Sequence, residues 1–170
     1  MRIYFTVFVI AFVAVAIWGW SVQQGVRVTA TRTDNELRTL GWAVLAYADA
    51  NGGAFPMDLA ALKSVGAARE SISLAPPSEG GGWPTRRSDA LQGHEPSDLD
   101  ASARSILIAW GTDPGMPPYF KPDGLPTHVG TGLEVNGWLA ALGKRGGAPV
   151  SQGAAQPDAP SASQSPPKQP

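Results

Sequence analysis

The chain has 170 residues, enough for one modest domain with a single core once an apolar N-terminal segment and a C-terminal tail are set aside. Its net charge is −1 and it has no long basic run, so the features of a nucleic-acid-binding protein are missing. The chain has no cysteine, which excludes disulfides, thiolate metal sites and cysteine nucleophiles but does not fix the cellular compartment. Only 16% of residues are charged, against 20 glycines and 16 prolines, which predicts a loop-rich domain.

The N-terminal segment is an apolar run, Ile3–Trp20, without charge or proline. As a helix it would be about 27 Å long, close to the hydrocarbon thickness of a bilayer. We therefore expect a single-pass anchor over residues 1–22 that binds the lipid bilayer, with Trp18 and Trp20 at the interface. A cleaved signal peptide is the alternative, but the apolar run is long and these tryptophans stand where small residues should precede a cleavage site.

A second helical pattern follows in a segment with large apolar residues at spacings of three and four, namely Leu37, Leu40, Val44 and Tyr47. This spacing predicts a stripe along one helix face, used for packing on a sheet within a soluble domain over residues 23–147. Ser21–Thr33 has weak helix propensity, so the helix either bends there, starts again near Asp34, or continues unbroken to Asn51. Asp49 lies off the stripe, and we expect its replacement by alanine to be mild.

The end of this helix is predicted at Asn51-Gly52-Gly53, because glycine fits the left-handed position after a helix. The pair Phe55-Pro56 follows in the turn. Asp58 is then placed to cap a short helix over Leu59–Val65.

The run LRTLGWAVLAYADANGGAFPMDLAALKSVG, Leu37–Gly66, resembles type IV pilin-like proteins and the pseudopilins of type II secretion. In those families an apolar N-terminal helix ends in an asparagine-glycine turn, followed by an aromatic-proline pair and a leucine-x-x-leucine segment. The matching residues here are Leu45, Tyr47, Asn51, Gly52, Phe55, Pro56, Leu59 and Leu62. The resemblance implies an α+β fold in which a long N-terminal transmembrane and stalk helix packs on a small antiparallel β-sheet.

The sequence departs from the family at its processing motif. The family's processing glycine and its glutamate would fall at Tyr4 and Val9, and neither is present. Cleavage by a prepilin peptidase and assembly into an ordinary pilus are therefore not expected, and residues 1–20 are expected to stay on the mature chain.

The charge distribution and the family resemblance indicate opposite orientations in the membrane. Arg27, Arg32 and Arg38 follow the span and only Arg2 precedes it, which by charge alone would place the domain in the cytoplasm. The family resemblance instead implies an inner (cytoplasmic) membrane anchor with a cytoplasmic N-terminus and a periplasmic domain.

The segment Ser71–Arg104 has little periodicity and many turn formers. Four of its side chains are weak candidates for a calcium or other metal site: His94, Glu95, Asp98 and Asp100. The alternative is a solvated acidic loop in which Asp98 or Asp100 caps a helix, and the order typical of a calcium loop is absent.

In the C-terminal half, Ser105–Trp110 predicts a strand and Tyr119-Phe120 a second one. Asn136-Gly137 predicts a hairpin turn, with a return strand starting at Trp138. Residues 148–170 are rich in proline, alanine, serine and glutamine, which predicts a disordered tail.

No motif predicts a catalytic residue or a cofactor, and His128 is expected to be a structural or surface histidine. We expect a non-catalytic, membrane-anchored, pilin-like structural or assembly protein of a secretion or envelope complex. Its partners would be other pilin-like or envelope subunits that contact the N-terminal helix. The alternative is a membrane-tethered module that binds a ligand or calcium through residues 71–104. A small hydrolase has no residue in its favour.

Overall fold

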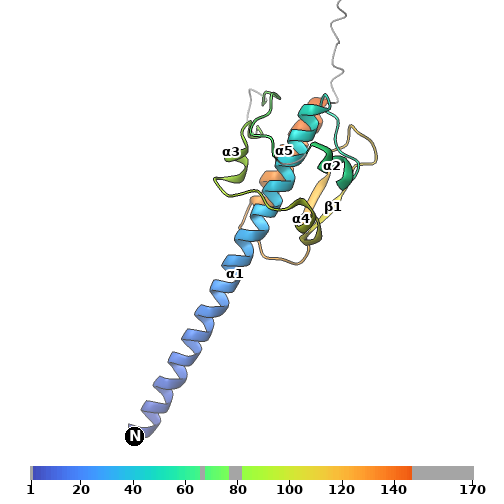
Figure 1. Cartoon of the computed structure of the whole chain (residues 1–170). Helices are drawn as coiled ribbons and strands as arrows, with labels where there is room; N and C mark the ends of the chain where they lie inside the picture. Colours follow the sequence, from blue (N-terminus) through green and yellow to red (C-terminus); the bar gives the residue numbers. More distant parts are fainter. Residues whose placement is uncertain (1, 66–67, 77–81, 147–170) are drawn as a thin grey trace, which may run out of the picture.

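The computed structural model describes residues 2–65, 68–76 and 82–146, and consists of a rod with a head at one end (Figure 1). The rod is α1 (Arg2–Ala50), a helix of 49 residues and about 73 Å. The head surrounds the C-terminal part of α1. Its elements are α2 (Leu59–Val65), α3 (Arg87–Leu91), α4 (Leu99–Ser105), β1 (Ile106–Ala109), β2 (Tyr119–Pro122) and α5 (Thr131–Gly146).

Helix α1 is continuous through the weak segment Ser21–Thr33, so the unbroken helix is the one of the three expected forms that is observed. Threonines in this segment donate their hydroxyl groups to the backbone carbonyls four residues earlier. The Thr29 hydroxyl bonds the Gly25 carbonyl at 3.0 Å, and the Thr33 hydroxyl bonds the Thr29 carbonyl at 2.9 Å. These bonds give the β-branched polar side chains a partner without leaving the helix.

The two parts of α1 have opposite environments. Every residue from Val7 to Val28 is exposed, whereas every residue from Glu36 to Ala46 is buried. From Val7 onward the helix is long and apolar enough to cross a membrane. A single helix of this kind near the N-terminus is what either a membrane span or a signal sequence requires.

The expectation of a one-faced apolar stripe is wrong, because a buried run of three turns leaves no face of the helix to solvent. Leu37, Leu40 and Val44 are fully buried and Tyr47 is half-buried, but the remaining faces are also covered. Those faces carry Trp42, Leu45 and small residues, and the small residues let neighbouring elements approach closely.

Gly41 marks the closest approach between α1 and α5. A Cβ atom at this position would lie 2.5 Å from Cγ1 of Val135, well inside van der Waals contact. The ring of Trp138 lies against the same spot. The two helices therefore pack at a distance that only glycine permits here.

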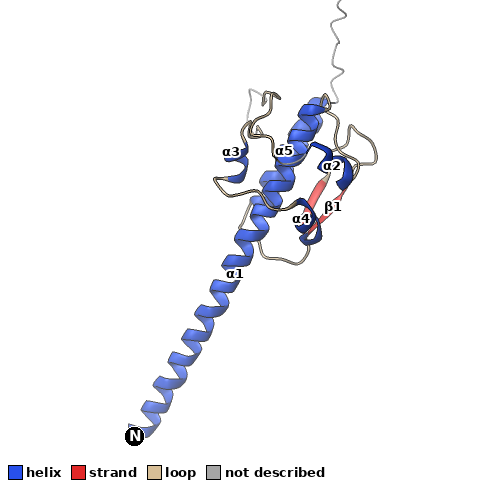
Figure 2. Cartoon of the chain, in the orientation of Figure 1, coloured by secondary structure: helices blue, strands red, loops and turns tan. Residues whose placement is uncertain are grey.

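The sheet is small and antiparallel, with β1 and β2 paired from Ile106–Pro122 to Ala109–Tyr119 (Figure 2). Both strands were predicted from the sequence and are confirmed. Ile106 and Phe120 point into the core against α1 and α5. A long apolar helix packed on a two-stranded sheet gives the α+β layout that was expected.

The predicted hairpin at Asn136-Gly137 is wrong, because both residues lie inside α5. The Asn136 side chain serves a different purpose. Its Oδ1 accepts a bond from the Phe120 amide at 2.9 Å, and its Nδ2 donates to the Phe120 carbonyl at 2.8 Å. The amide thus pairs with the open edge of β2 as a neighbouring strand would.

The end of α1 and the next turn are formed by Gly52, Gly53 and the pair Phe55-Pro56. Both glycines have positive φ angles, 64° and 94°, and the Gly53 amide bonds the Ala48 carbonyl at 2.8 Å. Phe55 and Pro56 are buried, and the Phe55 amide donates to the Pro114 carbonyl at 2.7 Å. Asp58 then caps α2 through the Ala61 amide.

The expectation that Asp49→Ala is mild does not fit the surroundings of this side chain. Its side chain is 6% exposed and bonds Nη1 of Arg69 at 2.7 Å. It also accepts bonds from the backbone amides of Ser73 and Leu74 at 2.8 and 2.9 Å. Asp49 therefore holds the segment after α2 against α1.

The predicted disordered tail, residues 148–170, lies outside the described residues.

Two glycines that differ in surroundings test the packing of α1 on α5. Gly41→Ala should destabilise the protein by about 1–3 kcal/mol, because the added methyl group meets Val135. Gly137→Ala meets nothing within 4 Å and should stabilise it by about 0.5–1 kcal/mol, as expected inside a helix. Thermal unfolding of the detergent-solubilised chain measures both, and a destabilised Gly137→Ala would contradict the helix assignment.

Asp49→Ala should lower the free energy of unfolding by about 2–3 kcal/mol, because the Ser73 and Leu74 amides and the Arg69 guanidinium lose a charged partner. Asp89→Ala is the matched control, since Asp89 is exposed and its side chain bonds only Ser88 among the described residues. Its effect should stay within about 0.5 kcal/mol. Equal effects of the two substitutions, measured by urea denaturation, would rule out this role of Asp49.

Candidate functional site

A belt of polar side chains surrounds α1 where the helix enters the head. We call it the polar belt; its members are Thr33, Asp34, Asn35, Glu36, Arg38 and Thr39. All are buried except Asn35, which is half-buried. Burying polar groups costs free energy unless they find hydrogen-bond partners, so the partners of the belt define this part of the molecule.

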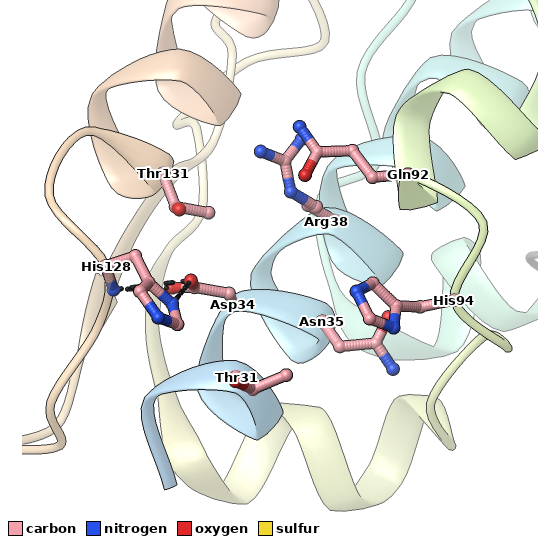
Figure 3. A pocket seen from close by; sticks show the side chains of 8 residues that line it. All are labelled: Thr31, Asp34, Asn35, Arg38, Gln92, His94, His128 and Thr131. Carbon is pink, nitrogen blue, oxygen red and sulfur yellow. Dashed lines mark hydrogen bonds and ion pairs between the residues drawn. The ribbon is translucent and has the colours of Figure 1, made fainter. Parts of the chain in front are cut away.

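Asp34 bonds the loop that precedes α5. Its carboxylate accepts bonds from the His128 backbone amide at 3.1 Å and from Nδ1 of the same histidine at 2.5 Å (Figure 3). The Asp34 side chain is 12% exposed and the His128 side chain 58%. One carboxylate therefore fixes both the backbone and the ring of His128.

Arg38 connects α1 to both α3 and α5. Its Nη2 lies 2.7 Å from Oε2 of Glu134, and its Nη1 donates to the Ala90 carbonyl at 3.3 Å. The guanidinium also lies 5.8 Å from the centre of the Trp138 ring, within cation–π range. Because the Arg38 side chain is only 7% exposed, these contacts replace its hydration.

The opposite side of the belt bonds the segment before α4. Nδ2 of Asn35 donates to the Glu95 carbonyl at 2.8 Å and to the Ser97 hydroxyl at 3.1 Å. The Thr39 hydroxyl accepts a bond from the Ser97 amide at 3.0 Å. Oδ1 of Asn35 is buried and has no partner among the described residues.

Two adjoining hollows lie beside the belt at the base of the head, where α1 enters it. Figure 3 shows the side chains that line the first of them. The first, about 380 Å³, is lined by Thr31, Asp34, Asn35, Arg38, Gln92, His94, His128 and Thr131. The second, about 450 Å³, is lined by Arg27, Val28, Thr31, Arg32, Asn35 and His94. They share Thr31, Asn35 and His94, and we call them together the base groove.

The residues proposed from the sequence as metal ligands do not converge. His94 lines the base groove, whereas Glu95 contributes its backbone carbonyl to the bond with Asn35. Asp98 caps α4 by accepting the Ala101 amide at 2.8 Å, and Asp100 pairs with Lys63. Within the described ranges no three histidine or acidic side chains form a group that could hold a metal ion. The capping alternative is thus correct for Asp98, and the four weak candidates do not form a metal site in this part of the chain.

Sequence reasoning missed most of the site. In the sequence, Asp34 marks only a point where the helix could start again, and Arg38 is only a charge that bears on membrane orientation, because the partners of both lie far along the chain. His128 is 94 residues from Asp34, and Glu134 is 96 residues from Arg38. The available signal was the density of polar residues from Thr31 to Thr39 in a helix that continues into an apolar core.

Comparison with known proteins does not assign a function to this site. No family model, no curated protein and no solved structure matches the chain.

Proposed function

We propose that this chain is a single-pass membrane protein of pilin-like layout that acts as a non-catalytic structural or assembly component of a secretion or envelope complex. The observation that carries the proposal is the division of one continuous helix. Its N-terminal part is apolar and exposed from Val7 to Val28, and its C-terminal part is buried in the head. An exposed apolar surface of this length is stable in a bilayer or against apolar helices of a partner.

The absence of a break in α1 supports a structural role. Helix α1 passes from the exposed part into the core without an interruption, and the belt bonds of Asp34 and Arg38 fix the head to it. A head joined through a helix keeps its orientation to the span, whereas a glycine- or serine-rich linker would let it turn freely. Such an arrangement suits a subunit that presents a surface to neighbours.

The family resemblance supports the same reading at the end of α1. The residues that carry it, Gly52, Phe55 and Pro56, form the turn that leads from the helix to the rest of the head. By this resemblance the membrane is the inner (cytoplasmic) membrane, the head is extracytoplasmic, and the partners are other pilin-like or envelope subunits.

A second candidate function is favoured by the base groove. A membrane-tethered ligand-binding module would place polar groups around an open volume, as Arg38, His94 and His128 are placed here. The calcium form of this alternative does not fit, because the candidate carboxylates are separated.

Membrane retention and orientation can be measured on the full chain. We expect the protein to resist carbonate extraction and to keep residues 1–20 by intact mass. Since the chain has no cysteine, a single cysteine at exposed Lys144 should react with an impermeant maleimide on spheroplasts. Labelling only after lysis would place the head in the cytoplasm, and a chain shortened within the apolar run would identify a signal peptide.

Lateral contacts of α1 can be tested by crosslinking through single cysteines at Ala11 and Ala14, both exposed. We expect crosslinked products of defined size in native membranes, because small residues allow close helix approach. A cysteine at exposed Ala60, on α2 in the head, is the matched control and should give none. Long homopolymeric ladders would indicate a pilus-forming subunit, and no product at any position would contradict assembly through the helix.

A further inference from the structure

The base groove begins near the level of the membrane if α1 is anchored as proposed. The apolar run ends at Trp20, and Arg27 follows seven residues later, about 10 Å along the helix. The headgroup layer of a bilayer extends about 5–8 Å beyond the hydrocarbon. Arg27, with a long side chain that can extend back toward lipid, therefore reaches the headgroups, and Thr31 lies one turn farther out.

The groove runs along one face of α1. Arg27, Thr31, Asp34 and Arg38 are spaced by four, three and four residues, so they line a single stripe that leads from the membrane side into the head. His94 and Gln92 close this stripe on the α3 side, and His128 and Thr131 close it on the α5 side (Figure 3). The groove therefore has α1 as its floor and one wall from each of these two parts of the head.

The lining contains three arginines and one carboxylate, Asp34, and that carboxylate is already bonded to His128. The nearby acids Glu36 and Glu134 are likewise bonded to Arg32 and Arg38. By contrast, Arg27 forms no ion pair with a described residue, and Arg32 uses only Nε, so both Nη groups stay available. The groups that remain free to bond at the mouth of the groove are thus hydrogen-bond donors. They favour an anionic ligand that is rich in acceptor atoms.

We propose that the base groove binds a phosphate group, presented as the headgroup of an anionic lipid in the membrane that holds α1. Arginine guanidinium groups match phosphate oxygens in a planar, two-pronged geometry. Arg27 and Arg32 contact the phosphate at the mouth, with His94 beside them. A hydroxylated headgroup such as glycerol extends inward, where the buried Oδ1 of Asn35 requires a donor. This inference rests on the proposed membrane anchoring.

The test uses the full chain in a neutral detergent, titrated with short-chain phosphatidylglycerol, short-chain phosphatidylcholine or inorganic phosphate, with bound lipid counted by native mass spectrometry. We expect one phosphatidylglycerol to bind and phosphatidylcholine not to. Arg27→Gln should weaken binding about tenfold or more. His94→Gln should weaken it by a smaller factor. Neither side chain makes a bond to a described residue, so both variants should fold as the parent does.

Lys144→Gln is the matched control, because it removes one exposed positive charge at the other end of α5 and should leave binding unchanged. Equal weakening by Lys144→Gln, or equal binding of phosphatidylcholine, overturns the proposal. If inorganic phosphate binds as tightly as phosphatidylglycerol, and Arg27→Gln weakens both to the same extent, the lipid is overturned as the source of the phosphate group. A chain that resists carbonate extraction but shows no selectivity contradicts this inference alone, whereas a chain that carbonate extracts contradicts the membrane proposal and, with it, the lipid as the source of the phosphate.

Discussion

The head depends on one constraint, the enclosure of α1 from Glu36 to Ala46 on every side. Apart from α5, the other elements of the head are too short to provide a core. Two strands of four residues are marginal by themselves, and α2, α3 and α4 are short. All of these elements contact α1, so they are stable only as its covering. The helix therefore acts as the core of the domain as well as its stalk.

The polar belt gives this covering a defined arrangement. Apolar contacts with a cylinder are compatible with many rotations of the surrounding segments, because hydrophobic burial is not directional. Arg38 removes that freedom, since Glu134 and Ala90 must both reach one guanidinium. Thr39 does the same for the segment that contains Ser97. The helix core supplies stability, and the belt determines which segment lies on which side.

The features that could be predicted from the sequence are those that residues close together in the chain determine. Local signals mark the turn after α1 at Gly52, the cap of α2 at Asp58 and the two strands, and the structure follows them. Asn136 led to the wrong prediction of a hairpin turn, because its side-chain amide pairs with Phe120, 16 residues away. The belt bonds of Asp34 and Arg38 join residues more than 90 positions apart and leave no local pattern. The enclosure of α1 was missed since small residues such as Gly41 pack as closely as large ones without appearing in an apolar stripe.

The position of the core helix at the start of the chain has a consequence for biosynthesis. A ribosome completes the helix first and Glu134, the ion-pair partner of Arg38, 96 residues later. At common rates of translation this delay is on the order of 5–20 s. During it, Trp42, Leu40 and Leu45 have no α5 to cover them. The nascent chain therefore passes through a period in which the segment that becomes the core is complete but is not yet covered by α5.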